Sequence, residues 1–122
     1  MCVFCNDFEK DRILFETTEW VAVYDSYPVS KGHTLLIPKA HYETFFDLPS
    51  QLIESLTYRL SDVKRILDEK FHPDGYNVGV NCGEAAGQTV MHCHIHIIPR
   101  YDGDTEDPRG GVRGVIPSKQ KY

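Results

Sequence analysis

The stretch from Gly87 to Arg100, which reads GQTVMHCHIHIIPR, constrains the fold more than any other part of the chain. Polar and apolar residues alternate through its centre as His92, Cys93, His94, Ile95, His96 and Ile97. Such alternation is typical of a half-buried β-strand, because successive side chains of a strand point to opposite faces. The pattern therefore predicts three imidazoles on one face and an apolar opposite face.

Two kinds of chemistry compete for these histidines. Histidine is the commonest metal-binding side chain, but a rise of about 3.3 Å per residue separates His92 from His96 by roughly 13 Å along a strand. A single ion bound by all three is therefore disfavoured. A neutral imidazole nitrogen can instead attack an electrophile while neighbouring groups hold its tautomer. Histidines gathered by chance on a polar sheet face are the structural alternative, which the strict period of two makes less favourable.

The bulk properties of the chain are those of one globular domain. Its 122 residues suffice for a single core, and 41% hydrophobic and 25% charged residues are ordinary values. A formal net charge of −5 argues against a protein that grips nucleic acid through a basic surface. The sequence shows no basic and apolar leader and no run of about 20 apolar residues, so we expect a cytoplasmic protein without a membrane segment.

Shorter patterns predict the other strands and one long helix. Two apolar runs, 13–16 and 20–24, flank a polar turn and indicate a β-hairpin. The segment 32–38 enters a further strand, which Pro38 ends or pushes to an edge of the sheet, and 76–81 alternates again. The helix follows a start signal at 47–50, ends at 73–75, and carries an apolar stripe of Ile53, Leu56, Leu60, Val63 and Leu67.

The loop 82–87 leads directly into the histidine strand. Its glycines, Gly83 and Gly87, permit backbone conformations that other residues avoid, as a loop packed against phosphate requires. Gln88 and Thr89 follow, and both offer donors for phosphoryl oxygens. This arrangement favours an anion-binding turn beside the histidines.

Several polar residues are ambiguous by themselves. Asp25 begins a turn, a common structural position for aspartate, and a lone His33 is more often a satisfied structural histidine. The pair Cys2-x-x-Cys5 indicates redox-active or zinc-binding thiols, or a reduced pair at a frayed terminus with His41 merely on the surface. One such pair is half of a zinc site.

The chain resembles the histidine triad superfamily of nucleotide hydrolases and transferases. The string from His92 to Ile98 matches the pattern His-φ-His-φ-His-φ-φ, where φ is apolar. Further matching segments, dispersed over roughly residues 2 to 101, are Cys2-Val3-Phe4-Cys5, Asp25, His33 with Leu35-Leu36-Ile37-Pro38-Lys39, Asn81 and Gly87-Gln88-Thr89-Val90. Several dispersed motifs that agree are stronger than one short match.

The resemblance implies an α+β fold over residues 1–101. It would contain an antiparallel sheet of about five strands, one long helix with a shorter one before it, and a homodimer that extends the sheet across a two-fold axis. Residues 102–122, rich in Asp, Gly, Pro and Arg, would form a tail on or near the domain. Arg109 and Arg113 either reach a polyphosphate or belong to a solvated or dimer-contacting arm.

The same resemblance implies roles for the site residues. Asp25 would bind a ribose hydroxyl, and His33 would either hydrogen-bond the third triad histidine or approach phosphate. The candidates for nucleotide binding are Val3, Phe4 and Val23 around a purine base, with Asn81, Gln88 and Thr89 toward the rest of the nucleotide. The family more often has serine at position 89, and threonine keeps the hydroxyl.

Family members with this CxxC resemble zinc proteins, which implies one structural Zn²⁺ per chain. The ligands would be Cys2, Cys5, His41 and His92, a closed set that leaves His94 for chemistry. The resemblance also leaves a place for Mg²⁺ bound with a polyphosphate substrate.

The implied reaction is nucleotidyl transfer to water. His94 would attack the α-phosphorus of a dinucleoside polyphosphate or nucleoside phosphoramidate and form a covalent intermediate, and His96 would place His94 or protonate the leaving group. Uridylyltransferase relatives carry glutamine at the third position, so histidine at 96 favours hydrolysis. The alternatives are a nucleotide-binding or sensing protein with negligible turnover, and a zinc-storage or redox protein unrelated to nucleotides.

Overall fold

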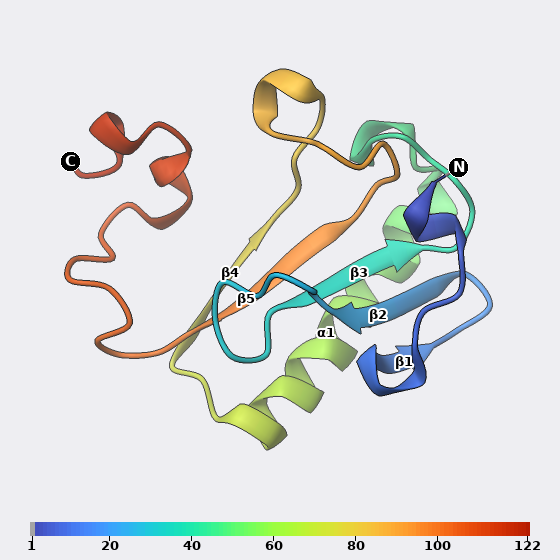
Figure 1. Ribbon diagram of the computed structural model, residues 1–122, viewed down its shortest axis with the longest axis horizontal. Helices are drawn as coiled ribbons and strands as arrows, with labels where there is room; N and C mark the ends of the chain where they lie inside the picture. Colours follow the sequence, from blue (N-terminus) through green and yellow to red (C-terminus); the bar gives the residue numbers. More distant parts are fainter. Residues whose placement is uncertain (1) are drawn as a thin grey trace.

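A computed structural model describes residues 2–122 as an α+β fold built on one antiparallel sheet (Figure 1). In the spatial order β1-β2-β3-β5-β4, the strands are β1 (Ile13–Glu16), β2 (Trp20–Tyr24), β3 (Thr34–Pro38), β5 (Ile95–Arg100) and β4 (Gly75–Gly79). The predicted fold class and sheet are confirmed. The long helix is α1 (Ser50–Phe71), whereas the shorter helix expected before it is a single 3₁₀ turn, η3 (Phe45–Asp47).

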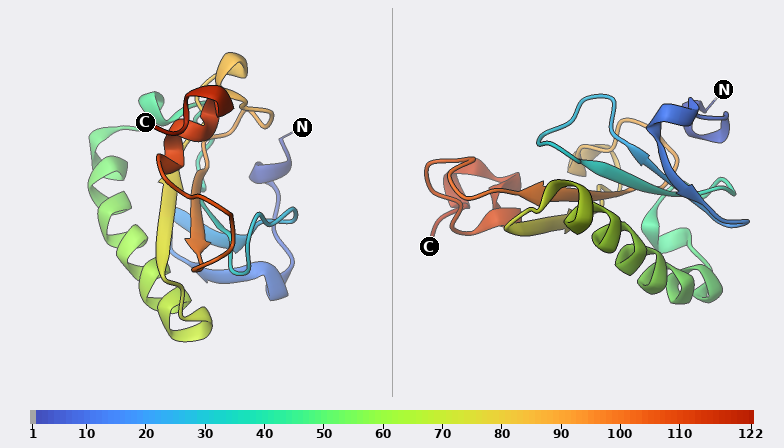
Figure 2. Two further views of the ribbon diagram at one scale, coloured as in Figure 1. Left: turned by 90° about the vertical axis from the view of Figure 1, so that its left-hand side faces the viewer. Right: turned by 90° about the horizontal axis from the view of Figure 1, so that it is seen from below.

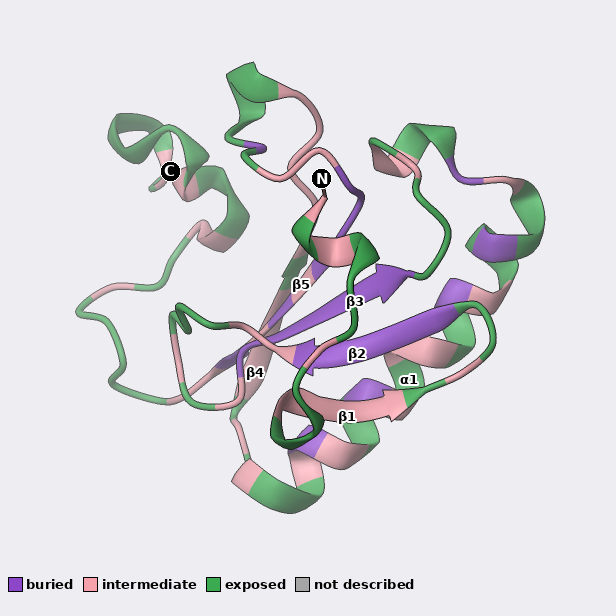
Figure 3. Ribbon diagram, turned by 45° about the vertical axis from the view of Figure 1, so that its right-hand side comes forward, coloured by how far each residue is buried: buried purple, intermediate pink, exposed green. Residues whose placement is uncertain are grey.

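The sheet separates α1 from the N-terminal segment, as the left view of Figure 2 shows. The helix side is the larger core, formed by Trp20, Leu36 and the apolar face of α1 together with Ile95 and Ile97. On the opposite side, Phe4 and Phe8 pack against a smaller apolar cluster of Val21, Val23, Leu35 and Ile37 from β2 and β3. The sheet therefore carries apolar residues on both faces, and β2 and β3 are buried along most of their length (Figure 3).

The face of α1 that meets the sheet differs by one position from the predicted stripe. Leu52, Leu56, Val63 and Leu67 are buried, whereas Ile53 is 37% exposed. The buried positions are spaced by four, seven and four residues, which places them on one face of a helix with 3.6 residues per turn. Position 53 lies about 100° around the helix axis from Leu52. Within the described residues no helix is both long and apolar enough to cross a membrane.

The histidine strand begins later than the alternation predicted. Residues 95–100 form the ladders of β5, with Leu35 opposite His96 on the neighbouring strand. Before Ile95 the chain leaves the ladder, and the amide of Cys93 donates to the carbonyl of Tyr42 at 2.6 Å. The strand expected over 76–81 is β4, shifted by one to two residues to 75–79.

The residues after β5 form a separate segment at the end of the molecule opposite the N-terminal turn (Figures 1 and 2). Arg100 pairs with both carboxylate oxygens of Asp104 at 2.8 Å, which fixes the turn that leaves the sheet. Two short 3₁₀ turns follow, η5 (Gly111–Val115) and η6 (Pro117–Lys119). The guanidinium of Arg113 donates to the carbonyls of Lys119 and Gln120 within this segment.

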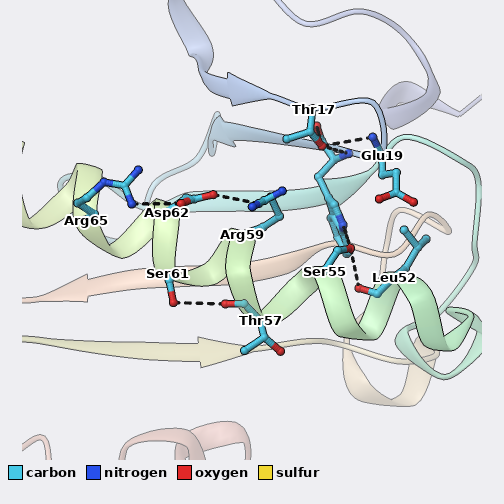
Figure 4. Close-up of polar contacts among 10 residues, drawn as sticks. Thr17, Glu19, Leu52, Ser55, Thr57, Arg59, Ser61, Asp62 and Arg65 are labelled. Carbon is cyan, nitrogen blue, oxygen red and sulfur yellow. Dashed lines mark hydrogen bonds and ion pairs between the residues drawn. The ribbon is translucent and has the colours of Figure 1, made fainter.

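The contact between Trp20 and Ser55 joins the sheet to α1 and yields a stability prediction. Figure 4 labels Ser55 among its neighbours on α1. The fully buried indole donates from Nε1 to Oγ of Ser55 at 2.8 Å. Ser55→Ala leaves that donor unsatisfied, so we expect the free energy of unfolding to fall by about 1–3 kcal/mol.

Ser61→Ala is the matched control, because Ser61 is exposed and its hydroxyl donates to the carbonyl of Thr57 on the same helix at 3.4 Å. This variant should change the free energy of unfolding by less than about 0.5 kcal/mol. Chemical denaturation of both variants measures the difference. Equal losses would contradict the role assigned to Ser55.

Candidate active site

The first triad histidine, His92, joins the sheet to a cluster of thiols. Its ring is fully buried, and Nε2 lies 2.7 Å from the carbonyl of Pro38. A carbonyl only accepts hydrogen bonds, so Nε2 carries the proton and Nδ1 keeps its lone pair. That lone pair is directed at the sulfurs of Cys2 and Cys5, each 3.4 Å from Nδ1.

His41 completes a Cys2His2 cluster whose dimensions fit zinc. Its Nδ1 lies 3.2 Å from Sγ of Cys5, and one donor atom from each of the four residues lies within 4.8 Å of the others. Zinc bonds of about 2.3 Å to sulfur and about 2.0 Å to nitrogen at a tetrahedral angle place sulfur and nitrogen about 3.5 Å apart. The observed separations of 3.2–3.4 Å correspond to the edges of such a tetrahedron.

The second triad histidine, His94, is held in the tautomer that a nucleophile needs. Its Nδ1 donates to the carbonyl of His92 at 2.8 Å, which leaves the lone pair on Nε2. Its side chain is almost fully buried, at 9% exposure, yet it lines a cavity. Phe4 meets the ring edge-on at a centroid distance of 5.0 Å. The ring is therefore fixed on both sides, with one nitrogen available for reaction.

The third triad histidine, His96, belongs to a chain of hydrogen bonds. The amide of Val29 donates to Nδ1 of His33 at 3.0 Å, so the proton of a neutral His33 is on Nε2. That Nε2 lies 2.9 Å from Nδ1 of His96 and 3.4 Å from a carboxylate oxygen of Asp25. His96 then accepts at Nδ1 and carries its own proton on Nε2. Of the two roles expected for His33, the geometry provides the hydrogen bond to the third histidine.

Burial keeps this pair of histidines uncharged. The pKa of His96 is lowered to about 4, first by burial and then by the nearby His94 and His33, against the opposing effect of Asp25. Burial also lowers the pKa of His33, and Asp25 opposes it. Both rings are thus neutral near pH 7, which agrees with the hydrogen-bond directions given above.

A cavity of about 740 Å³ opens beside His94 and His96. Of the residues predicted to bind nucleotide, five line it: Val3, Phe4, Asp25, Asn81 and Thr89. The carboxylate of Asp25 also accepts the amide of Tyr27 at 2.9 Å, so this residue both forms the predicted turn and faces the site. The glycines of the adjoining loop have positive φ angles, 91° at Gly83 and 92° at Gly87, as predicted.

Two predicted nucleotide contacts lie elsewhere. Gln88 is buried, and its side chain is hydrogen-bonded to three backbone groups. Its Oε1 accepts from the amide of Gly83, and its Nε2 donates to the carbonyls of Glu43 and Val90. Its side-chain amide therefore holds the loop 83–90 in shape, and Gln88 does not line the cavity. Val23 is fully buried in the cluster beneath Phe4 and Phe8, so it supports the cavity wall from behind.

Other cavity residues were not found from the sequence. Phe8, Arg12 and Leu35 line the cavity as well. Arg12 donates to the carbonyl of Tyr24 at 3.0 Å and lies over the ring of Phe8, 5.3 Å from its centroid. These positions depend on how the N-terminal segment crosses the sheet, for which the sequence contains no periodic signal.

A second group of potential metal ligands, Asp25, His33 and His96, is better explained by hydrogen bonds. The 2.9 Å contact between the two rings requires a proton between them. Magnesium favours near-octahedral oxygen ligands, and neither this group nor the Cys2His2 cluster supplies them. The expectation of Mg²⁺ gains no support from these residues. Arg109 and Arg113 also lie outside the cavity lining.

An antiparallel sheet that presents alternating histidines beside such a cavity defines a histidine triad domain. The chain belongs to the HIT family, since the sequence model of the HIT domain matches residues 7–103. A HIT-like protein of Methanocaldococcus jannaschii, itself named uncharacterized, is 40% identical over 94% of this chain and 92% of its own length. Adenylylsulfatase HINT3 of Arabidopsis thaliana is 35% identical over 84% of this chain and 54% of its own length.

Two solved structures support the same assignment. A Zn-bound histidine triad family protein of Mycobacterium smegmatis superposes with a TM-score of 0.77 at 34% identity, covering 87% of this chain and 79% of its own. A hypothetical histidine triad nucleotide-binding protein of Sulfolobus tokodaii gives a TM-score of 0.78 at 34% identity, covering 87% and 73%. The family resemblance expected from the motifs is confirmed.

The lowered pKa of His96 predicts acid sensitivity. Below pH 6.5 the unfolded chain takes up a proton at this position that the folded chain resists until about pH 4, so stability is lost as the pH falls through that interval. From pH 7 to pH 5 we expect a loss of about 1–2 kcal/mol from this residue. Denaturant titrations of the wild type and of His96→Gln test it, and the variant should lose less stability. Parallel pH profiles would contradict the prediction.

Proposed function

We propose that the protein is a hydrolase that transfers a nucleotidyl group to water through a covalent intermediate on His94. The observation that carries the proposal is the hydrogen bond from Nδ1 of His94 to the carbonyl of His92, which leaves the lone pair on Nε2 of a ring that lines the cavity. The nucleotide-binding name of the Sulfolobus tokodaii relative and the adenylylsulfatase name of the Arabidopsis relative support a nucleotide substrate.

In the first step, Nε2 of His94 attacks the α-phosphorus, and the bond from that phosphorus to the leaving group breaks. The leaving group departs with the bonding electrons, and the ring becomes positively charged. The carbonyl of His92 already faces Nδ1–H and stabilises this charge without rearrangement. In the second step, water attacks the phosphorus, the electron pair returns to Nε2, and a nucleoside monophosphate and a proton are released.

The other site residues have supporting roles in this proposal. His96 is neutral, so we assign it hydrogen-bond donation from Nε2 to phosphoryl oxygen and the placement of His94, in preference to proton delivery as an imidazolium. Thr89, Asp25, Phe4 and Val3 all line the cavity. In this proposal Thr89 would face the phosphates, Asp25 would accept a ribose hydroxyl, and Phe4 with Val3 would form part of the apolar wall for the base. The predicted purine preference rests on that wall.

The Cys2His2 cluster is proposed to hold one structural Zn²⁺ per chain. Its dimensions support zinc, as does the Zn-bound name of the Mycobacterium smegmatis relative. All four coordination positions would be filled by the protein, so the ion would supply rigidity and leave the phosphoryl chemistry to His94. The predicted homodimer and cytoplasmic location stay predictions.

Replacement of the nucleophile tests the reaction. His94→Ala should lower turnover by about a thousandfold or more while the fold persists, because no other group forms the covalent intermediate. The panel would contain adenosine phosphoramidate, a diadenosine polyphosphate and adenylylsulfate, with His72→Asn as a control histidine outside both clusters. Mass spectrometry of quenched wild type should detect a nucleotidyl adduct on His94.

Retention of activity in His94→Ala would refute the covalent mechanism. Tight binding of nucleotides with no turnover in the wild type would instead favour the nucleotide-sensing alternative.

Metal analysis tests the zinc assignment. The purified wild type should contain one zinc per chain, and His92→Ala should contain much less and melt at a lower temperature, since it loses one of four ligands. Elemental analysis and a thermal melt measure both effects. An unchanged metal content would refute the assignment, and more than one tightly bound ion or a reversible Cys2–Cys5 disulfide would favour the storage or redox alternative.

A further inference from the structure

The two cysteines of the Cys2His2 cluster flank, in the sequence, two residues of the cavity wall. Val3 and Phe4 lie between Cys2 and Cys5 in the turn η1 (Val3–Cys5), and both line the cavity beside His94. None of the four cluster residues lines that cavity. The cluster therefore borders the wall residues without lining the cavity itself, and Cys2 and His41 line a second depression that shares Val3 with the cavity.

Few contacts fix this wall apart from the cluster. For residues 2–8, the described hydrogen-bond contacts to other segments are those from the sulfurs of Cys2 and Cys5 to His41 and His92. The turn η1 has no buried residue, and Val3 is 60% exposed. Packing of Phe4 and Phe8 on the sheet supplies the remainder. A terminal segment with so few attachments frays unless it is tied down.

The wall is also thin. A second depression of about 490 Å³ lies next to Cys2 and His41. It shares three lining residues with the cavity, namely Val3, Thr89 and Val90. Phe4 extends from this wall to the nucleophile, with its ring edge-on to His94 and 6.2 Å from the ring centroid of His92. Displacement of residues 3 and 4 would join the two depressions and remove a neighbour of His94.

We propose that the metal cluster is a clasp that builds the nucleotide cavity: with the ion bound, Val3 and Phe4 form the wall, and without it the wall opens and nucleotide affinity falls. This inference rests on the proposed function, because it concerns the same cavity. It assigns the cluster a part in substrate binding although its four residues lie outside the cavity lining.

Apparent affinity falls in proportion to the fraction of molecules in the binding-competent form. If the wall is closed in about one tenth of metal-free molecules, the Kd for a nucleoside monophosphate rises about tenfold. The sheet and α1 share the larger core, which contains no residue of 2–8, so the loss of structure on metal removal should be confined to the N-terminal segment.

The experiment compares the zinc-loaded protein with the same protein after chelation and after zinc is added back. Calorimetry with AMP should show a rise in Kd of about tenfold or more on chelation and recovery on reloading. Hydrogen exchange should increase in residues 2–8 and stay slow in β3 and β5. Equal Kd values for the loaded and metal-free forms would overturn the clasp, as would exchange that increases around His94 with residues 2–8 unchanged.

A second variant separates the wall from the ion. Phe4→Ala should keep a full complement of zinc and still bind AMP about tenfold more weakly, a loss of about 1.4 kcal/mol. Phe46→Ala is the matched control, because Phe46 is 83% exposed and outside the cavity lining. Wild-type affinity in zinc-loaded Phe4→Ala would overturn the proposal even if chelation unfolds the whole domain. Failure of the zinc-loaded wild type to bind any nucleoside monophosphate would instead refute the proposed function.

Discussion

The position of one imidazole, that of His92, determines how the rest of the site is arranged. Its Nε2–H donates a hydrogen bond to the carbonyl of Pro38 at the end of β3, which attaches the ring to the sheet and fixes its tautomer. Its Nδ1 therefore faces the thiols, and its own backbone carbonyl receives Nδ1 of His94. A single buried residue thus orients both the Cys2His2 cluster and the ring of His94.

Both faces of the sheet are covered by other parts of the chain, because the central strands carry apolar residues on both faces. One face meets the long helix, and the larger of the two buried apolar clusters lies between them. The other face carries the triad and is covered by the N-terminal segment, which adds Phe4 and Phe8 to the cavity. The larger core and the cavity therefore lie on opposite faces of the same strands.

Periodicity predicted the strands, the hairpin and the helix well, because each reflects the local geometry of one element. It misplaced Ile53 by one position, since a stripe of leucines and isoleucines fits two neighbouring helix faces and only the packed sheet distinguishes them. The motif likeness identified the histidines and the four candidate ligands. It did not reveal that the side chain of Gln88 is hydrogen-bonded to backbone groups, or that Phe8, Arg12 and Leu35 line the cavity. Those contacts join segments that are far apart in the sequence, so no local pattern predicts them.

Cys2 and His92 are 90 positions apart in the sequence, so an ion held between them would turn most of the polypeptide into a closed ring. Closing a ring of that size restricts the unfolded chain more than closing a short one does. During translation Cys2, Cys5 and His41 leave the ribosome long before His92 has been made. The four-ligand set of Cys2, Cys5, His41 and His92 would therefore be complete only after His92 has been made, so closure of the ring around an ion would depend on metal supply late in synthesis.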